Sequence, residues 1–526
     1  MMRNFSFLLR LVCVILMLML CATIVACTAT PNEGTDTSLQ TVGEIEASTA
    51  TNPSETSVVT EAGVDTEVMT QAEEQTSAET SADSQAGKEP AADTQAETQP
   101  TTQAPEETQP EPVDDFEPVV RFAVVSDIHF ATTRDEEAAK QIELLYKTAY
   151  AYSNSHSTYK NLDAVLYAGD IADRGTDWEF QTFYAAVNKH TKAGTQNIVG
   201  LGNHEYNDNA QLAESRFIAA GGQESINTHT VINGYHVIVI SPDLQNGWRY
   251  STSLLNWLDA ELQKAVADDP TGVKPVFVAH HVGATDTVYG TEGSGDPNIG
   301  AVFCKYPQVV SFSGHSHRPL SDQASLWQGE YTALGTGGMY HFCHTFEDGR
   351  EIYANGNTGG WSDSYIGPDG GQYYIIEVNA KNEIRILRYD VIADTFLYST
   401  VLGSVGDPEK FDYKTAELKE NSELPAFPQD AVIVPVKLNK RTASFTFPQA
   451  TTTAGVRYYR CEVYQEGALV TTVYRMSDSH LQPTPAELEL PVSGLERNTD
   501  YVLKIIPVNS YGREGEPLTL EFSTAP

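Results

Sequence analysis

The chain has 526 residues, more than one hydrophobic core usually organises, so we expect several folded units together with some unfolded chain. It has 71 acidic against 33 basic residues, and its formal net charge is -38. This charge excludes bulk nucleic-acid binding and attraction to anionic membrane surfaces, because both need a basic patch. A phosphate-bearing ligand would have to be attracted locally, by bound cations or a few arginines.

Residues 1–26 are predicted to be an export signal. Basic residues flank the start of an apolar stretch, LVCVILMLMLCATIV, which is short for a membrane span. The letters IVAC at its end resemble the lipobox of bacterial lipoproteins, which implies cleavage before Cys27 and attachment of lipid to its sulfur. The alternative is an uncleaved anchor. Both place the remainder outside the cytoplasm, and the first anchors it by lipid to the outer face of a bacterial cell membrane.

Residues 27–117 are predicted to form a disordered, acidic stalk. Thr, Glu, Ala, Gln, Ser and Pro dominate this segment, and Lys88 is its one basic residue. Such a composition cannot bury enough apolar surface to offset the entropy lost on ordering. About half of the net charge lies here, so the repulsion between carboxylates should extend the segment.

Residues 118–407 are predicted to form a layered α/β domain, because apolar strand-like runs alternate with helical patterns at 135–153 and 178–194. Several runs are apolar throughout, as strands covered on both faces must be. The domain should close near residue 407. The strand-like runs lie at 118–130, 164–169, 197–202, 235–241, 274–280, 309–314, 371–379 and 383–391.

The C-terminal part changes character, with a linker at 408–424 and short alternating strands from 425 to 526. Regularly spaced turn signals predict a small all-β sandwich. The stretch GLERNTDYVLKIIPVNSYGREGEP resembles the end of a fibronectin type III domain, with Tyr501 in the place of its tyrosine corner. A β-rich extension of the preceding domain is the alternative. We expect this part to act as a spacer or to bind cell-envelope carbohydrate.

Five short motifs lie where predicted strands end, namely DIH, GDIADRG, GNHE, AHH and GHSH. Folds of the α/β class bring side chains from such positions together around a ligand. Singly, each has a plainer interpretation as a chance triplet, a turn or a hydrogen-bonded loop histidine. Together, in this order, they indicate one site, and their Asp, Asn and His donors suit divalent Mn, Fe or Zn.

This series resembles that of the calcineurin-like metallophosphoesterase family, in which DxH, GDxxD, GNH[DE], H and GHxH follow one another in the same order. The match spans about residues 120–320. It implies a four-layer αββα sandwich, with two mixed sheets between helices, and a site for two divalent metal ions. Asp170 would bridge the two ions. The implied ligands are Asp127, His129, Asp170, Asn203, His280, His315 and His317.

The resemblance and the chemistry of such a site also imply catalytic roles. A hydroxide bridging the metals would attack phosphorus in line with the leaving group. Arg174 would stabilise charge on the phosphoryl oxygens. His204 would protonate the leaving group, and Asp173 would orient His204 and raise its pKa.

Two histidine clusters leave alternatives open. In AHH, neighbouring strand residues point to opposite faces, so we assign His280 to the metal and expect His281 to contact substrate or to pack. In HFCH, residues 341–344, a zinc site would lack a fourth ligand at suitable spacing, so a chance cluster or the lining of a substrate pocket is the favoured interpretation. A disulfide between Cys304 and Cys343 stays open.

Two departures from related enzymes narrow the substrate. Asp173 stands where purple acid phosphatases have a tyrosine ligand, and Leu201 stands where protein Ser/Thr phosphatases have an arginine. A small phosphomonoester or phosphodiester is therefore the predicted substrate, and we expect a monomer. The alternative is an exported adhesion or binding protein that uses the phosphoesterase fold as a scaffold. The presence of every expected ligand disfavours it.

Overall fold

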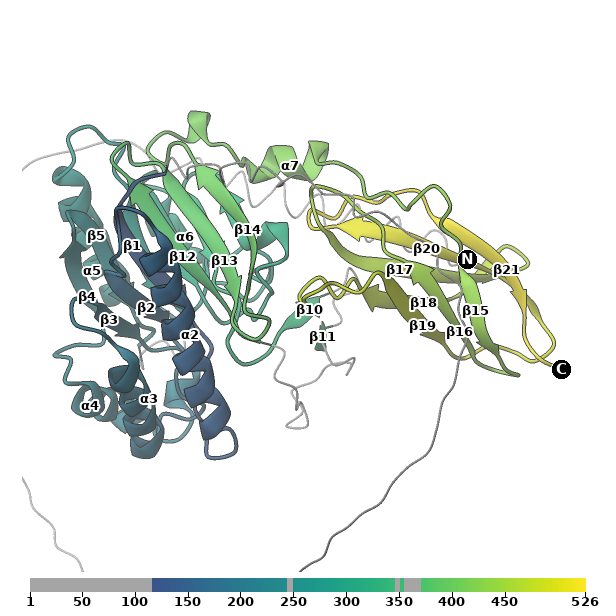
Figure 1. Cartoon of the computed structure of the whole chain (residues 1–526), viewed down its shortest axis with the longest axis horizontal. Coiled ribbons are helices and arrows are strands. Elements are labelled where there is room, and N and C mark those ends of the chain that lie inside the picture. The colour runs from purple at the N-terminus through teal and green to yellow at the C-terminus, as the bar shows by residue number, and fades with distance from the viewer. Residues whose placement is uncertain (1–115, 244–248, 346–350, 354–369) are drawn as a thin grey trace, which may run out of the picture. The chain divides into compact units, whose positions relative to one another are not determined.

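The computed structural model describes residues 116–243, 249–345, 351–353 and 370–526 (Figure 1). The predicted export signal, Cys27 and nearly all of the predicted stalk lie outside these ranges. Among the helices of the described ranges, none combines the length and apolarity that a membrane span requires.

The first sheet has six strands in the order β14-β13-β12-β1-β2-β3. The sheet is mixed. The strands β1, β2 and β3 pair in parallel with one another, whereas the β1–β12, β12–β13 and β13–β14 pairs are antiparallel. Its strands are β1 (Pro118–Val125), β2 (Ala164–Ala168), β3 (Gln196–Gly200), β12 (Gln372–Asn379), β13 (Ile384–Asp390) and β14 (Thr395–Leu402).

The second sheet also has six strands, in the order β4-β5-β6-β7-β9-β8. Its central strands β5, β6, β7 and β9 are parallel, and β4 and β8 pair antiparallel at the two edges. Its strands are β4 (Thr228–Ile232), β5 (Tyr235–Ile240), β6 (Val276–His280), β7 (Val309–Ser313), β8 (Leu326–Gln328) and β9 (Thr332–Gly335).

Alternation of side chains along β1 shows how the layers form. Val120, Phe122 and Val124 point into a core that both sheets share, whereas Ala123 and Val125 point into a core that the helices cover. A third core lies between the second sheet and its own helices. The predicted four-layer αββα arrangement is therefore confirmed. The first sheet is covered by α2 (Asp135–Ser155), α3 (Asp177–His190) and α4 (Ala210–Gly221), and the second by α5 (Thr252–Ala267) and α6 (Pro297–Phe303).

A capping box fixes where α3 begins, directly after the GDIADRG motif. The side chain of Thr176 accepts a hydrogen bond from the backbone N–H of Glu179, and Glu179 accepts one from the backbone N–H of Thr176. Glu179 also accepts the backbone N–H of Arg174 at 3.2 Å. The cap therefore stabilises the helix and holds the end of the motif loop.

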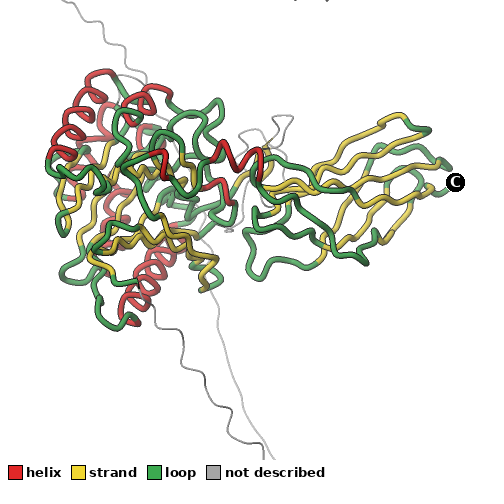
Figure 2. Tube along the Cα trace, turned by 90° about the horizontal axis from the view of Figure 1, so that it is seen from above, coloured by secondary structure: helices red, strands yellow, loops and turns green. Residues whose placement is uncertain are grey.

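The last strands form an all-β sandwich, as predicted (Figure 2). One sheet has the order β15-β16-β19 and the other β18-β17-β20-β21, and their inward side chains share one core. The hydroxyl oxygen of Tyr501 accepts the backbone N–H of Glu496 at 2.8 Å, which is the hydrogen bond of a tyrosine corner. The strands are β15 (Val434–Leu438), β16 (Ala443–Pro448), β17 (Val456–Gln465), β18 (Ala468–Met476), β19 (Glu487–Val492), β20 (Asp500–Asn509) and β21 (Leu518–Ser523).

Short elements connect these units. The 3-10 helix η3 (Gln323–Ser325) precedes β8, and β10 (Cys343–Thr345) pairs with β11 (Glu351–Tyr353). The predicted linker contains η4 (Pro408–Lys410) and α7 (Thr415–Asn421). A further 3-10 helix, η1 (His204–Tyr206), follows β3.

Candidate metal centre

The motif residues follow the carboxyl ends of strands in both sheets. Asp127, Asp170 and Asn203 come shortly after the parallel strands β1, β2 and β3. His281 and His315 come shortly after the parallel strands β6 and β7 of the other sheet. The carboxyl ends of parallel strands lie along one edge of a sheet, so motifs that are far apart in the sequence come close together there.

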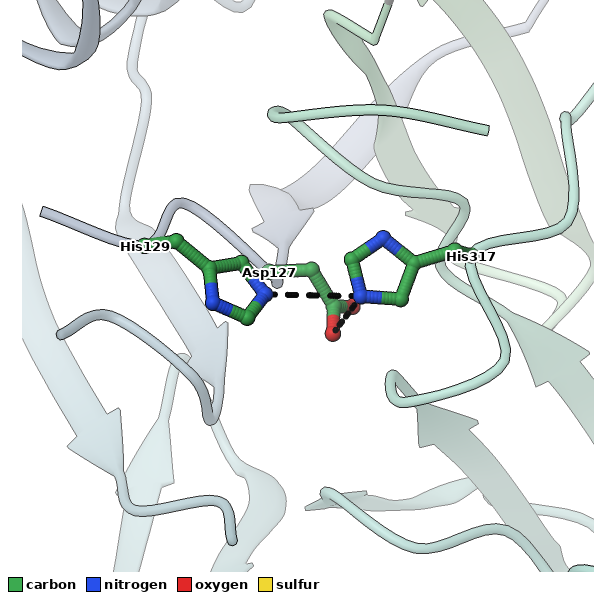
Figure 3. A group of neighbouring side chains, drawn as sticks. All are labelled: Asp127, His129 and His317. Carbon is green, nitrogen blue, oxygen red and sulfur yellow. Dashed lines mark hydrogen bonds and ion pairs between the residues drawn. The ribbon is translucent and has the colours of Figure 1, made fainter. Parts of the chain in front are cut away.

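Asp127, His129 and His317 form the first group of donors, and their ligand atoms all lie within 4.8 Å of one another. The two imidazole rings approach the Asp127 carboxylate from opposite sides (Figure 3). His317 Nε2 lies 3.2 Å from Asp127 Oδ1 and 3.4 Å from His129 Nε2. All three residues are buried.

Contacts with His341 fix the orientation of the His317 ring. Its Nδ1 lies 3.1 Å from the backbone carbonyl oxygen of His341, so this nitrogen donates a proton to the carbonyl. In a neutral ring, Nε2 then carries a lone pair that faces Asp127 and His129. The ring of His341 also stacks on that of His317, with centroids 4.1 Å apart and planes 12° apart.

Asp170, His281 and His315 form a second group, again with ligand atoms within 4.8 Å of one another. His281 Nδ1 donates to the carbonyl oxygen of Ala168 at 2.9 Å. Its Nε2 consequently faces two oxygens, Asp170 Oδ2 at 3.1 Å and Asn203 Oδ1 at 3.1 Å. Lone pairs in this arrangement repel one another unless a proton or a cation lies between them.

Asp170 joins the two groups. Its Oδ2 lies 3.8 Å from His129 Nε2, and its Oδ1 accepts the backbone N–H of His204 at 2.9 Å. Burial opposes ionisation of this carboxyl, but His281 and His204 outweigh burial and hold its pKa well below the usual range. A charged carboxylate in a buried position between two groups of donors is suited to neutralising cations.

The histidine pKa values divide by environment. Burial lowers the pKa of His129 and of His315 to about 4, so both rings are neutral near pH 7, the form that binds a metal. Burial acts the same way on His281, but the Asp170 carboxylate outweighs it and raises its pKa to about 9. The protonated ring thus occupies the position of positive charge that a cation would take.

The structure corrects the assignment of His280. This side chain points away from the donor groups and packs against Tyr250 and Phe303, with ring centroids 6.2 Å and 5.3 Å away. Along β6, Phe277 faces the core between the sheets, and alternation puts His281 on that same side. His281, not His280, therefore contributes to the site.

Five donor residues have a left-handed backbone conformation, which side chains other than glycine rarely adopt. Such conformations persist only where surrounding contacts enforce them, and they concentrate at functional sites. Their clustering here supports a functional origin for the site independently of the side-chain chemistry. These residues are Asp127 (φ 54°), His129 (φ 51°), Asp170 (φ 50°), His315 (φ 69°) and His317 (φ 52°).

Two motif glycines let the carboxylates approach the backbone of another loop. A Cβ at Gly202, in GNHE, would lie 2.2 Å from Asp170 Oδ1. A Cβ at Gly314, in GHSH, would lie 2.8 Å from Asp127 Oδ2. Both distances are too short for real contacts, so glycine is required for these loops to close around the carboxylates.

The three predicted catalytic residues have different surroundings. Asp173 Oδ1 lies 3.3 Å from His204 Nδ1 and 3.5 Å from His129 Nδ1. Burial alone would lower the pKa of His204, but Asp170 and Asp173 raise it to about 10. The side chain of Arg174 is exposed, and its guanidinium has no hydrogen bond or ion pair with any described residue.

Two buried charged residues hold the motif loops and were not predicted. The guanidinium of Arg134 donates to the carbonyl oxygen of His129 at 2.9 Å and also bonds that of Ile128. Glu205 accepts the backbone N–H groups of Ala172 at 2.9 Å and Gly202 at 2.5 Å. The Glu of GNHE was a visible signal for this role, whereas nothing local marked Arg134.

A tyrosine and the segment 338–343 complete the support. The hydroxyl oxygen of Tyr250 accepts the backbone N–H of His281 at 3.1 Å. The backbone N–H of Tyr340 donates to the carbonyl oxygen of Asp127 at 3.0 Å, and that of Cys343 donates to His317 at 2.9 Å. His341 and Cys343 of the HFCH cluster therefore lie behind the first donor group. The side chain of His344 is not among those that the structure describes.

The donor set fits divalent cations. Oxygen and nitrogen donors converge with lone pairs facing one another, and none of the groups contains a thiolate. None of the described cysteines, Cys304, Cys343 and Cys461, forms a disulfide, so the possible bridge between Cys304 and Cys343 is absent. The fold and the site together define a metal-binding αββα protein.

Comparison with known proteins gives one match to a family model. Residues 120–319 match the sequence model of the calcineurin-like phosphoesterases, which confirms the resemblance seen in the motifs over this part of the chain. A search of curated proteins found no match.

Solved structures give weak similarities to both parts. PhoD is 12% identical, over 56% of this chain and 70% of that chain, with a TM-score of 0.32. The fibronectin type-III domain of human fibronectin type III domain containing protein 3 is 23% identical, over 20% of this chain and 88% of that chain, with a TM-score of 0.15. A redesigned β-sandwich protein is 19% identical, over 20% and 95%, with a TM-score of 0.15.

Proposed function

We propose that this protein hydrolyses small phosphomonoesters or phosphodiesters with two divalent metal ions. The proposal depends most on the pair of donor groups, one formed by Asp127, His129 and His317 and the other by Asp170, His281 and His315. Asp170 joins them, because its Oδ2 lies 3.8 Å from His129 Nε2. We assign one ion to each group. We assign the amide oxygen of Asn203 to the second group as well, because this oxygen lies 3.1 Å from His281 Nε2.

Divalent ions in this site would supply Lewis acidity toward a phosphoryl oxygen and lower the pKa of a water molecule. The protein's own residues orient the metal-binding side chains and neutralise positive charge. Asp170 balances positive charge between the two groups, and the carbonyl groups of Ala168 and His341 fix the tautomers of His281 and His317. Fixed ring orientation limits the reorganisation needed during reaction.

His204 is the proposed general acid. Asp173 and the Asp173 backbone carbonyl both lie near His204 Nδ1, at 3.3 Å and 3.1 Å. Holding Nδ1 in this way leaves Nε2 for a leaving-group oxygen. Arg174, directly beside Asp173 and exposed, is the cationic side chain that we assign to the non-bridging phosphate oxygens.

The test compares p-nitrophenyl phosphate with bis(p-nitrophenyl) phosphate, using the exported chain with added Mn²⁺ and then with EDTA. We expect turnover of at least one substrate, lost on chelation and restored by metal. Preference for the diester would define a phosphodiesterase, and preference for the monoester a phosphatase. Absence of turnover of both, with metal measured in the protein, would overturn the proposal and favour the adhesion or binding protein.

We also propose that a lipid on Cys27 anchors the protein outside the cytoplasm, that the chain is a monomer and that the C-terminal sandwich contacts cell-envelope carbohydrate. The lipobox-like IVAC sequence supports the anchor. Cys27→Ser should release the protein from bacterial membranes, as measured by fractionation. Unchanged membrane association of this variant would contradict a lipid anchor.

A further inference from the structure

We propose that the C-terminal sandwich positions the metal-site loop that carries His315 and His317, and that Arg457 of β17 is its positioning residue. The kinetic part of this proposal depends on the proposed phosphoesterase function, whereas its structural part does not. The proposed positioning role goes beyond that of a spacer for the C-terminal strands.

The first contact is an ion pair between a partly buried arginine and a buried aspartate, 135 residues apart in the sequence. Arg457 Nε lies 2.6 Å from Asp322 Oδ2, and Arg457 Nη2 lies 3.0 Å from Asp322 Oδ1. Their side chains are 13% and 3% exposed. Asp322 also accepts the backbone N–H of Ala324 at 2.9 Å, which caps η3. A two-point pair of this kind fixes orientation as well as distance.

The second contact leads toward the metal site. The guanidinium of Arg457 lies 3.7 Å from the ring centroid of Tyr289, and the guanidinium of Arg318 lies 5.1 Å from the same ring. Arg318 directly follows His317 and bonds the sulfur of Cys343. Cys343 in turn donates its backbone N–H to the carbonyl oxygen of His317. A continuous set of contacts thus joins Arg457 to a metal-site histidine.

Further contacts from the sandwich reach the same part of the fold. The backbone N–H of Gln323 donates to Ser510 Oγ at 3.2 Å, and the rings of Phe342 and His480 have centroids 5.9 Å apart. Both contacts involve segments that follow His317 in the sequence, at Gln323 and at Phe342. Because His315 and His317 have left-handed backbones, their loop needs contacts that enforce this conformation.

The test uses Arg457→Met, which removes the charge but keeps an unbranched apolar side chain. The matched control is Arg460→Met, on the same strand, where the arginine pairs with Glu514, whose side chain is 43% exposed. Arg457→Met should increase amide hydrogen exchange over residues 315–323 and speed loss of Mn²⁺ to a weak chelator. It should also lower kcat by about tenfold, with a smaller change in KM, as expected when reacting groups are misplaced.

A double variant, Asp322→Asn with Arg457→Met, separates positioning from stability. Removing both charges avoids a buried unpaired carboxylate and should restore much of the thermal stability that Arg457→Met loses. It should not restore slow exchange at 315–323, because the contact with Tyr289 is still missing. This variant also supplies the comparison should the single variant fold poorly.

Two results would overturn the inference. One is equal exchange and equal metal retention in the Arg457→Met and Arg460→Met proteins. The other is full recovery of exchange protection, metal retention and kcat in the double variant, which would show a purely structural role. Lack of phosphoesterase turnover in the wild-type protein would overturn the proposed function alone, since exchange and metal retention still decide the positioning role.

Discussion

The adjacent histidines at the end of β6 show how much one residue of register decides. His281 has its Nε2 between Asp170 and Asn203, whereas His280 lies on the helix-covered face of the same sheet. Burial lowers the pKa of His280 to about 4, so it is a neutral packing residue near pH 7. The two side chains are chemically identical and differ only in their surroundings, so variants of one serve as controls for variants of the other.

Replacing each of the two by glutamine should separate their roles. His281→Gln should lose metal from the second donor group and lower kcat/KM by more than the ~10–100-fold that loss of an outer-shell partner produces. His280→Gln should keep its metal, because its contacts are with Val282, Tyr250 and Phe303. Metal content and kcat/KM check both variants, and the reverse pattern would restore the original assignment of His280.

His204→Ala tests the general acid. The variant should keep the metal content of the wild-type protein yet lower kcat by about 10²-fold or more for esters with poor leaving groups, because those depend most on protonation. The effect should be smaller for p-nitrophenyl esters. Asp170→Asn is the contrasting variant and should lose metal. Undiminished turnover of an alkyl phosphate by His204→Ala would remove this residue from the mechanism.

At the scale of elements, loops after parallel strands bear the donors, and short-range bonds fix where those loops end. The capping box at Thr176 closes the GDIADRG loop, and Glu205 ties the loops after β2 and β3 together. The helix α5 was not among the predicted helices, although Leu254, Leu258 and Leu262 have helical spacing and are buried. Its signal was present in the sequence.

The tyrosine corner offers a test of the sandwich. Tyr501→Phe leaves the backbone N–H of Glu496 without its acceptor, so it should lower the free energy of unfolding of the sandwich by about 1–3 kcal/mol. Tyr464→Phe, on the partly exposed face of β17, should change it by less than about 0.5 kcal/mol. Urea unfolding measures both, and equal stability of the two variants would contradict this role of Tyr501.

At the scale of the whole molecule, the predicted stalk accounts for much of the net charge of -38. The pH dependence of the stability of the folded part comes from buried groups that titrate. Burial lowers the pKa of His480 from 6.5 to about 4, although Asp478 opposes this. The unfolded chain then binds a proton that the folded chain does not, between pH 6.5 and pH 4.

Stability should therefore fall as pH decreases through this range, and the contribution of His480 is fully present above pH 6.5. The loss attributable to His480 is on the order of 3 kcal/mol. His480→Phe keeps an aromatic ring next to Phe342 and removes the titration. Unfolding free energies at pH 7, 5.5 and 4 should decrease less steeply in this variant, and an unchanged pH dependence would exclude His480 as a contributor.

The sequence by itself determined the donor types, their order along the chain and their positions after apolar strands, because these depend on local pattern. It also determined the layered α/β class and the all-β C-terminal part, through the periods of apolar residues. The Tyr501 corner was visible for the same reason, since the tyrosine and its partner Glu496 are close in sequence.

Only the tertiary structure decided which face of β6 meets the other sheet, and so which histidine joins the site. The pairing of Arg457 with Asp322 and the support of His317 by His341 likewise have no local signal, because their partners come from distant segments. A sequence pattern gives the alternation of faces but not what each face contacts. That choice is made by packing of the two sheets against each other and against their helices.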